Sequence, residues 1–280
     1  MFNFNQLNQI HLEVTSNCQA SCPMCPRNIH GGLKNPNLKI KNWTIDQYKT
    51  IINHEVLDQV TRIYFCGNYG DPLLNNDLLD MIEYTSSYNP KLHIAIHTNG
   101  SLRSRDWWQT LASVMPEDSS VIFAIDGLED THSLYRIGTD FNKIIENAKA
   151  FIDNGGRAEW HFIRFKHNEH QVLEAKVMAK ELGFEHFTMK DSSRWLVKPE
   201  FPVYDNRGNT IYNLEPSQYS PIKIIDKDTI ENYKTLLEKV EIKCYAKSLK
   251  EVYIDHLGIM YPCCWLANNP SQPPEQEGSL

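Results

Sequence analysis

The chain lacks the features that mark several large classes of protein. No uninterrupted apolar run in its 280 residues approaches the ~20 residues needed to span a bilayer. The N-terminal stretch MFNFNQLNQIHLEV has no basic segment followed by an apolar one, so no secretory signal is expected. There is no basic excess, because 28 basic residues face 35 acidic ones and the net charge is -7. This balance argues against nucleic acid or a membrane surface as a partner.

A disulfide framework is also missing. Seven cysteines is an odd number, and this favours a reducing, cytoplasmic location. Three cysteines lie within residues 18–25, three lie within residues 244–264, and Cys66 stands alone between them. The sequence has no His-x3-His pair of the kind that zinc hydrolases carry on a helix. The two groups of cysteines therefore predict metal chemistry at both ends of the chain.

Alternating segments dominate the first two thirds of the chain. Strands are expected at residues 10–14, 62–67, 92–100, 120–127, 158–165 and 186–190, and helices at residues 44–60, 76–88, 106–114, 140–156 and 169–183. Strands that alternate with helices predict a parallel sheet with right-handed crossovers. Six such units are too few for the complete eight-stranded barrel. The predicted α/β fold is therefore an open, partial (β/α)6 TIM-like barrel.

The remaining third has a different character. Residues 191–227 are rich in Pro, Asn, Ser and Tyr and carry little periodicity, which indicates a long ordered connection or a lid. A helix is expected at residues 228–240, and a cysteine-bearing β-hairpin with the turn DHLG follows it. The tail is rich in Pro, Gln and Asn and is expected to be disordered. We therefore divide the chain into a barrel, an irregular connection with a helix, a small hairpin module and a tail, at residues 1–190, 191–240, 241–266 and 267–280.

Cys18, Cys22 and Cys25 admit two interpretations. A structural zinc site uses four ligands, commonly in paired Cys-x2-Cys knuckles, but only one such pair is present and the nearest further ligand is His30. An iron–sulfur cluster is held by thiolates, and three thiolates on a four-iron cluster leave one iron without a protein ligand. Such an open position is what a catalytic metal requires. The spacing therefore favours an iron–sulfur cluster.

Other polar residues follow the predicted strands. In GNYGDPLLN (67–75), glycine permits close backbone approach to a ligand and Asp71 can accept hydrogen bonds from an ammonium group. A plain surface turn is the alternative for this stretch. Asn99 and Asp126 would lie at carboxyl ends of strands, where open α/β sheets bind ligands.

Taken in order, these stretches resemble the radical S-adenosylmethionine (SAM) superfamily. Four motifs follow the first four strands in the order found in that family, and the resemblance covers about residues 10–190. They are Cys-x3-Cys-x2-Cys, GNYGDPLLN, HTNGS (97–101) and AIDGLEDTHSLYR (124–136). The resemblance implies a 4Fe-4S cluster on Cys18, Cys22 and Cys25. It also implies SAM binding by five residues, namely Gly70, Asp71, Asn99, Asp126 and Arg136. The Arg136 guanidinium would match the SAM carboxylate, although a surface helix arginine is the alternative.

The chain departs from the family pattern at three positions. Met24 replaces an aromatic residue, Asp71 replaces the more usual Glu, and Ala124 stands where a Ser is frequent. The resemblance implies reductive cleavage of SAM to a 5′-deoxyadenosyl radical that abstracts hydrogen from a substrate. The cofactor carries this chemistry, the protein positions it, and flavodoxin or ferredoxin is the expected reductant.

The C-terminal cysteines carry a second resemblance. The spacing Cys-x13-Gly-x4-Cys, formed by Cys244, Gly258 and Cys263, is similar to the opening of the SPASM extension or of its shortened form, the twitch domain. This resemblance implies an auxiliary iron–sulfur cluster on Cys244, Cys263 and Cys264. A remnant hairpin whose cysteines are only small apolar residues is the alternative. The same default applies to Cys66, for which a role as hydrogen donor or extra ligand stays open.

Three functions remain open from the sequence. The run at 124–136 and the extension resemble the peptide-modifying branches, so a peptide or protein side chain is the expected substrate. A small-molecule dehydrogenase or epimerase, acting on a sugar or cyclitol, is the second hypothesis. A non-catalytic iron–sulfur protein for electron transfer is the third. No catalytic side chain is identified from the sequence.

Overall fold

The computed structural model describes residues 3–195, 200–220 and 243–267. Its main element is an eight-stranded sheet with the order β12-β11-β1-β4-β5-β6-β7-β8. The six strands that the sequence predicts pair in parallel, and they are β1 (Gln9–Leu12), β4 (Arg62–Phe65), β5 (His93–Thr98), β6 (Ser120–Ala124), β7 (Arg157–Arg164) and β8 (His186–Asp191). The predicted α/β fold with a parallel sheet is confirmed.

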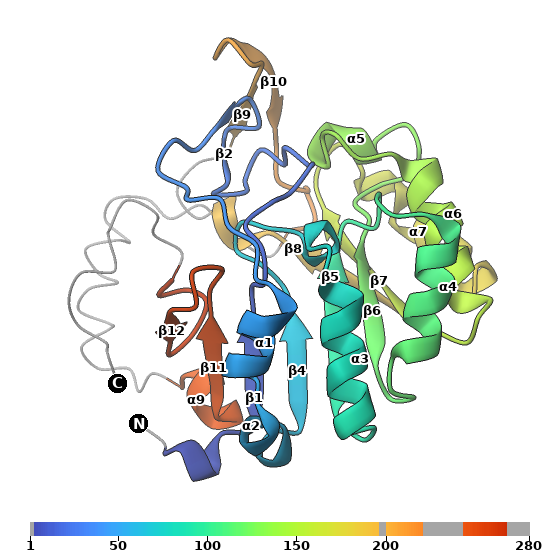
Figure 1. The fold of residues 1–280 in the computed structure, drawn as a ribbon. Helices are drawn as coiled ribbons and strands as arrows, with labels where there is room; N and C mark the ends of the chain where they lie inside the picture. Colours follow the sequence, from blue (N-terminus) through green and yellow to red (C-terminus); the bar gives the residue numbers. More distant parts are fainter. Residues whose placement is uncertain (1–2, 196–199, 221–242, 268–280) are drawn as a thin grey trace.

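Helices connect the strands and lie together against one side of the sheet (Figure 1). The α-helices are α1 (Ile45–Ile51), α2 (His54–Gln59), α3 (Leu78–Tyr88), α4 (Arg105–Val114), α5 (His132–Tyr135), α6 (Phe141–Ile152), α7 (Val172–Glu181) and α9 (Tyr245–Leu249). Short 3-10 turns are η1 (Phe4–Gln6), η2 (Pro72–Leu74), η3 (Glu169–Gln171) and η4 (Ser193–Trp195).

The helix predicted over residues 44–60 is two helices in the structure. Thr44 caps α1 as expected, and its side chain accepts from the amide of Gln47 at 3.2 Å. Asn53 then caps a new helix, because its Oδ1 accepts from the amide of Val56 at 3.1 Å. An asparagine side chain can replace helix hydrogen bonds in this way, and the helix is therefore interrupted at residues 52–53. The apolar periodicity of the sequence continues across this interruption and does not reveal it.

The expectation of an irregular segment at 191–227 is wrong for part of its length. Strands β9 (Phe201–Tyr204) and β10 (Thr210–Leu214) form an antiparallel hairpin. Asp205 shapes its turn by accepting from the amides of Arg207 and Asn209 at 2.8 and 2.9 Å. The hairpin lies near the strand pair β2 (Asn28–Ile29) and β3 (Leu33–Lys34). Both pairs lie beyond the carboxyl ends of the parallel strands of the main sheet (Figure 1). The helix predicted at 228–240 and the tail from residue 268 lie outside the described residues.

The C-terminal segment extends the main sheet. Strand β11 (Glu251–Ile254) pairs in parallel with β1, and β12 (Met260–Tyr261) pairs antiparallel with β11. Asp255 accepts from the amides of Leu257 and Ile259 at the turn, and Gly258 has a φ of +85° there. Residues 251–261 therefore form one end of the same sheet as the N-terminal strands.

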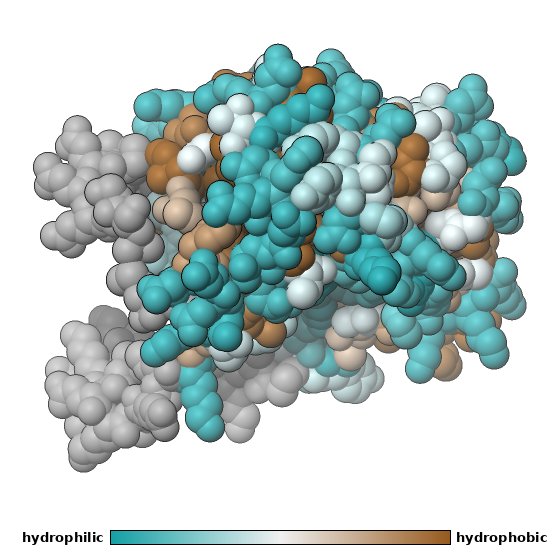
Figure 2. Space-filling view, turned by 60° about the horizontal axis from the view of Figure 1, so that its bottom comes forward, coloured by the Kyte–Doolittle hydropathy of each residue, from teal (hydrophilic) through white to brown (hydrophobic). Residues whose placement is uncertain are grey.

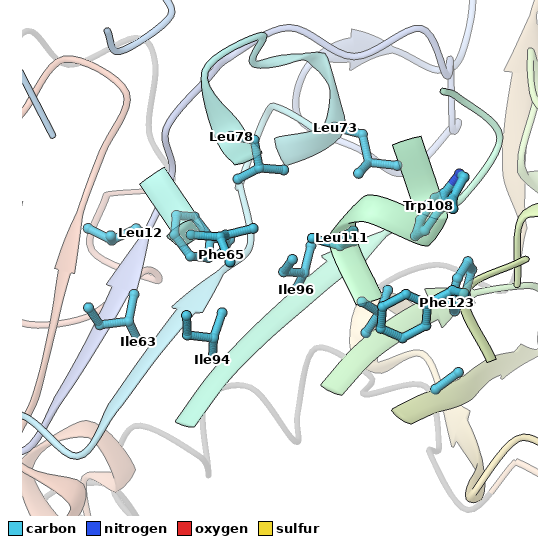
Figure 3. Packing of buried hydrophobic residues seen from close by; sticks show 14 of the residues in the cluster. Leu12, Ile63, Phe65, Leu73, Leu78, Ile94, Ile96, Trp108, Leu111 and Phe123 are labelled. Carbon is cyan, nitrogen blue, oxygen red and sulfur yellow. The ribbon is translucent and has the colours of Figure 1, made fainter. Parts of the chain in front are cut away.

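The two faces of the sheet differ in chemistry because successive side chains point to opposite sides. Figure 3 shows apolar residues of one face meeting residues of the helices, among them Ile63, Phe65, Ile94, Ile96, Leu78, Trp108, Leu111 and Phe123. The alternate positions carry polar side chains, including His11, Tyr64, His97, His161 and Lys190. The helix-covered face holds the core and leaves the other face free for chemistry.

The outer surface is largely hydrophilic on the face that Figure 2 shows, where brown patches are scattered among teal residues. Among the described residues, no helix combines the length and apolar character needed to cross a membrane.

The buried face gives a direct test of the core. Ile94 is 0% exposed, whereas Ile211 on β10 is 57% exposed. Changing Ile94 to Ala removes buried methyl groups and leaves a cavity, so the free energy of unfolding should fall by about 2–5 kcal/mol. The matched Ile211→Ala variant should change it by less than about 0.5 kcal/mol. Urea unfolding measures both values, and an equal loss in the two variants would contradict this assignment of the core.

Candidate functional site

A cavity of about 330 Å³ lies at the carboxyl end of the parallel strands. The loop after β1 contributes Cys18, Cys22 and Cys25, and the loops after the next three strands contribute Gly70, Asp71, Asn99 and Arg136. Asp126 is fully buried behind Arg136. Cys66, His97, Ile122, His161, Ile163, Lys190 and Arg194 also line the cavity. The fold therefore brings the predicted N-terminal site residues to one place.

Two of the three N-terminal thiols face polar donors, whereas the Sγ of Cys25 lies 3.9 Å from the carbonyl oxygen of Asn68. Arg136 Nη1 lies 3.8 Å from the Sγ of Cys22, and Asn99 Nδ2 lies 3.8 Å from the Sγ of Cys18. Burial raises the pKa of all three thiols, that of Cys25 to about 11. Donors aimed at sulfur suit thiolates, which are the form that binds a metal. In the part of the chain that the structure describes, no three His, Cys, Asp or Glu side chains converge on a single ion.

The turn at residues 67–71 packs tightly on the cysteine loop. The amide of Asp71 donates to the carbonyl of Asn17 at 2.8 Å. A Cβ added at Gly70 would lie 1.8 Å from the carbonyl oxygen of Thr15, which is backbone and cannot move aside. Only glycine allows this approach, so the two loops that the sequence singles out are locked together.

Asp71 is buried and organises the loop after β5. Its carboxylate accepts from the hydroxyl of Thr98 at 2.9 and 3.0 Å, and from the amide and side chain of Asn99 at 2.7 and 2.6 Å. It also accepts from the amide of Leu73 at 3.0 Å. Burial raises the pKa of Asp71, and these hydrogen bonds act against that shift. The carboxyl group thus sets the position of Asn99 beside the cavity.

Arg136 and Asp126 form an ion pair at the cavity wall. The Nε of Arg136 donates to Oδ2 of Asp126 at 2.6 Å, and the guanidinium carbon lies 5.3 Å from the ring centre of Tyr135. Asp126 also accepts from the amide of Ile163. Burial raises the pKa of Asp126, and the positive charge of Arg136 lowers it again. The pair fixes the guanidinium, whose Nη1 faces the Sγ of Cys22.

Glu13 is a structural centre of the site that the sequence analysis missed. Its Oε1 accepts from the amides of Tyr69 and Gly70 at 2.7 and 2.9 Å. Its Oε2 accepts from the hydroxyl of Tyr253 at 2.5 Å and lies 3.3 Å from Nδ1 of His256. The available signal was an acidic residue between Leu12 and Val14 at the end of the predicted strand IHLEV. Glu13 ties the 67–71 turn to the C-terminal hairpin.

The C-terminal cysteines lie in a different environment. Cys244 is exposed at the start of α9, while Cys263 and Cys264 follow β12 and are partly exposed. The carbonyl of Cys264 accepts from Asn68 Nδ2 at 2.8 Å, so this segment contacts the 67–71 turn. Within residues 243–267 the structure shows no convergence of these three cysteines on one ion.

Because Glu13 links the two segments, we expect the hydroxyl group of Tyr253 to contribute strongly to the stability of the fold. Changing Tyr253 to Phe removes the hydrogen bond to the buried carboxylate and should lower the free energy of unfolding by about 1.5–3 kcal/mol. Tyr245 is 72% exposed, so Tyr245→Phe is the matched control and should change little. Urea unfolding of both variants measures the difference. If Tyr253→Phe is as stable as its control, the hydroxyl does not anchor Glu13.

Several solved structures share this fold. SuiB of Streptococcus suis bound to its precursor peptide SuiA matches with a TM-score of 0.63 at 15% identity, over 96% of this chain and 62% of that one. The anSMEcpe enzyme with bound SAM matches with a TM-score of 0.57 at 16% identity, over 92% of this chain and 74% of that one. At these identities the likeness establishes the fold alone.

Sequence comparison gives a curated relative and a family. The S-adenosyl-L-methionine-dependent 2-deoxy-scyllo-inosamine dehydrogenase of Niallia circulans is 29% identical over 114 residues, which are 38% of this chain and 40% of that protein. The match thus spans well under half of that relative. The family model of the radical SAM superfamily matches residues 12–176, more than half of the chain and the whole region from the cysteine loop to α7. The protein belongs to the radical SAM superfamily.

Proposed function

We propose that this protein is an enzyme that cleaves SAM reductively and uses the resulting radical on a peptide or protein side chain. The observation that carries the proposal is the arrangement of Cys18, Cys22 and Cys25 around one cavity with Arg136 and the 67–71 turn. The family membership of residues 12–176 supports the same chemistry.

The three thiols fit a 4Fe-4S cluster. They line one cavity, and Arg136 and Asn99 aim donors at two of the sulfurs. A cluster needs one thiolate for each of three irons, so the thiols need not meet at a single point. When bound, the cluster supplies the electron that cleaves the sulfonium of SAM to methionine and the 5′-deoxyadenosyl radical.

The residues around the cysteines suit the polar end of SAM. Arg136 offers a guanidinium that Asp126 holds in place, and such a group binds a carboxylate well. Asp71 supplies negative charge for an ammonium and aligns Asn99, while Gly70 brings backbone close to the ligand. Asp71 thus acts mainly by positioning, because its oxygens already accept bonds from residues 73, 98 and 99.

The substrate is proposed to be a peptide because the 124–136 run resembles the peptide-modifying branches. SuiB, which shares the fold, is described in complex with a precursor peptide. The second candidate is a small-molecule dehydrogenase, and the curated relative from Niallia circulans favours it. The third candidate, an electron-transfer protein, would bind the cluster without cleaving SAM.

The C-terminal region is proposed to be a SPASM- or twitch-like module beside an open partial (β/α)6 barrel. Its support is the Cys-x13-Gly-x4-Cys spacing and a hairpin that joins the main sheet next to β1. Cys244, Cys263 and Cys264 would hold an auxiliary cluster together with another ligand. Flavodoxin or ferredoxin in the cytoplasm would supply electrons to the enzyme.

The first test concerns the N-terminal cluster. The variant with Cys18, Cys22 and Cys25 all changed to Ala should form no 5′-deoxyadenosine from SAM and dithionite, whereas the wild type forms it slowly without substrate. Chromatography of the products measures this. The matched control is Cys66→Ala, which removes a thiol of the same cavity and should retain SAM cleavage.

The same triple variant tests the auxiliary cluster. If the hairpin module binds one, the variant keeps about two to four irons per chain, in line with common cluster sizes. That iron should be lost on changing Cys244 and Cys263 as well. A triple variant without iron would refute the auxiliary cluster, and a wild type that binds zinc and no iron would refute the whole proposal.

The second test concerns the SAM carboxylate. Changing Arg136 to Met should weaken SAM binding about tenfold to a hundredfold, because a charged hydrogen bond is lost. The matched control is Arg164→Met, which breaks a comparable ion pair with Asp191 outside the cavity lining. Equilibrium dialysis with labelled SAM measures both constants. Arg136→Lys keeps a positive charge and should retain part of the SAM binding. If Arg136→Met and Arg164→Met bind SAM with equal affinity, Arg136 is not the residue that contacts the SAM carboxylate.

A further inference from the structure

The part of the cavity wall that β6, β7 and β8 supply has an apolar floor and a basic edge. Ile122, Ala124 and Ile163 come from β6 and the end of β7 and supply the apolar surface. Lys190 of β8 lines the same cavity, and the register of the sheet sets it opposite Ile163 on the neighbouring strand. An aliphatic chain that ends in a charged group would match this surface.

Lys190 is held by a chain of polar contacts. Its Nζ lies 3.1 Å from Nδ1 of His161, and Nε2 of His161 lies 3.5 Å from Oε2 of Glu159. Ser120 donates to the other oxygen of Glu159 at 3.2 Å. The hydrogen bond from His161 lowers the pKa of Glu159 to about 2, so the carboxylate is ionised. His161 then donates from Nε2 and accepts from the ammonium at Nδ1, which leaves two N–H groups of Lys190 free to bind a ligand.

No acid neutralises this ammonium within the described residues. Lys190 makes no ion pair there, and Asp71 is the sole carboxylate among the residues that line the cavity. The oxygens of Asp71 are already occupied by residues 73, 98 and 99. The imidazole of His97 stays neutral, because burial is the largest cause that lowers its pKa, to about 3.

Two further cations, Arg136 and Arg194, line the cavity. Arg136 is paired with Asp126, and its Nη1 faces the Sγ of Cys22. Arg194 lies on η4, after the end of β8. Lys190 is the cation that the register of the sheet places beside Ile163 of the apolar floor.

We propose that Lys190, positioned by His161 and Glu159, is an anion subsite that binds the carboxylate of an acidic substrate side chain. The substrate would then be a peptide with Glu or Asp at or beside the reacting residue. This inference rests on the proposed function for the identity of the ligand, and it assigns the substrate class within the same cavity. A neutral or cationic small molecule would make no charge-assisted hydrogen bond with this ammonium.

The test uses two blocked amino acids that differ only in charge. N-acetyl-L-glutamate N-methylamide and its glutamine analogue are titrated into the reconstituted protein with SAM and without reductant, and ligand-detected NMR gives both dissociation constants. The wild type should prefer the glutamate probe by about tenfold, the difference expected for a charged hydrogen bond. Lys190→Met should abolish the preference, Lys190→Arg should retain most of it, and Glu159→Gln should reduce it.

Lys176→Met is the matched control, because Lys176 is an exposed lysine on α7 outside the cavity lining and its loss should leave the preference intact. Equal binding of the two probes by the wild type would overturn the proposal. A preference that survives in Lys190→Met but disappears in Arg194→Met would also overturn it. Because the titration requires no SAM cleavage, a protein that discriminates the probes but forms no 5′-deoxyadenosine would refute only the proposed function.

Discussion

The buried carboxylate of Glu13 is the contact on which the arrangement of the site depends. It lies just after β1, where the cysteine loop begins, and it receives the amides of Tyr69 and Gly70 from the loop after β4. Its other oxygen receives the hydroxyl of Tyr253 from β11. A buried carboxylate is costly unless its oxygens are satisfied, so these three segments have to stay together. The last strands of the described chain thereby fix a turn that lies about 180 residues earlier.

This link changes how the C-terminal region is understood. The sequence suggested a separate hairpin carrying metal ligands, but β11 takes a place in the main sheet directly beside β1. Removing it would expose the polar edge of β1 and leave Glu13 without two of its partners. The region therefore has a structural role that does not depend on whether its cysteines bind an auxiliary cluster.

The fold and the grouping of the N-terminal site were predictable because both follow from local patterns. Alternating strands and helices determine a parallel sheet, and carboxyl ends of parallel strands meet at one edge, which brings Cys22, Asp71 and Arg136 together. Glu13 and the hairpin at 201–214 were missed for different reasons. The partners of Glu13 lie far away in the sequence, and the short strands β9 and β10 are separated by a turn in a segment rich in polar residues. The break at Asn53 was missed because apolar periodicity does not report a side chain that caps a helix.

The distribution of charge in the cavity follows from the same two-faced sheet. Most apolar residues of the strands point to the helix-covered side. The opposite side carries His97, His161 and Lys190 on three strands, beside the apolar floor of Ile122, Ala124 and Ile163. Near the cysteine loop Arg136 is paired with Asp126. On the β8 side the ammonium of Lys190 is oriented by an imidazole and, in the described residues, meets no carboxylate. An oriented cation favours an anionic ligand over a neutral one of the same shape, because only the anion makes a charge-assisted hydrogen bond with it. Selection between substrates is therefore expected at β8, while the cysteine side is suited to the groups shared by all reactions of the family.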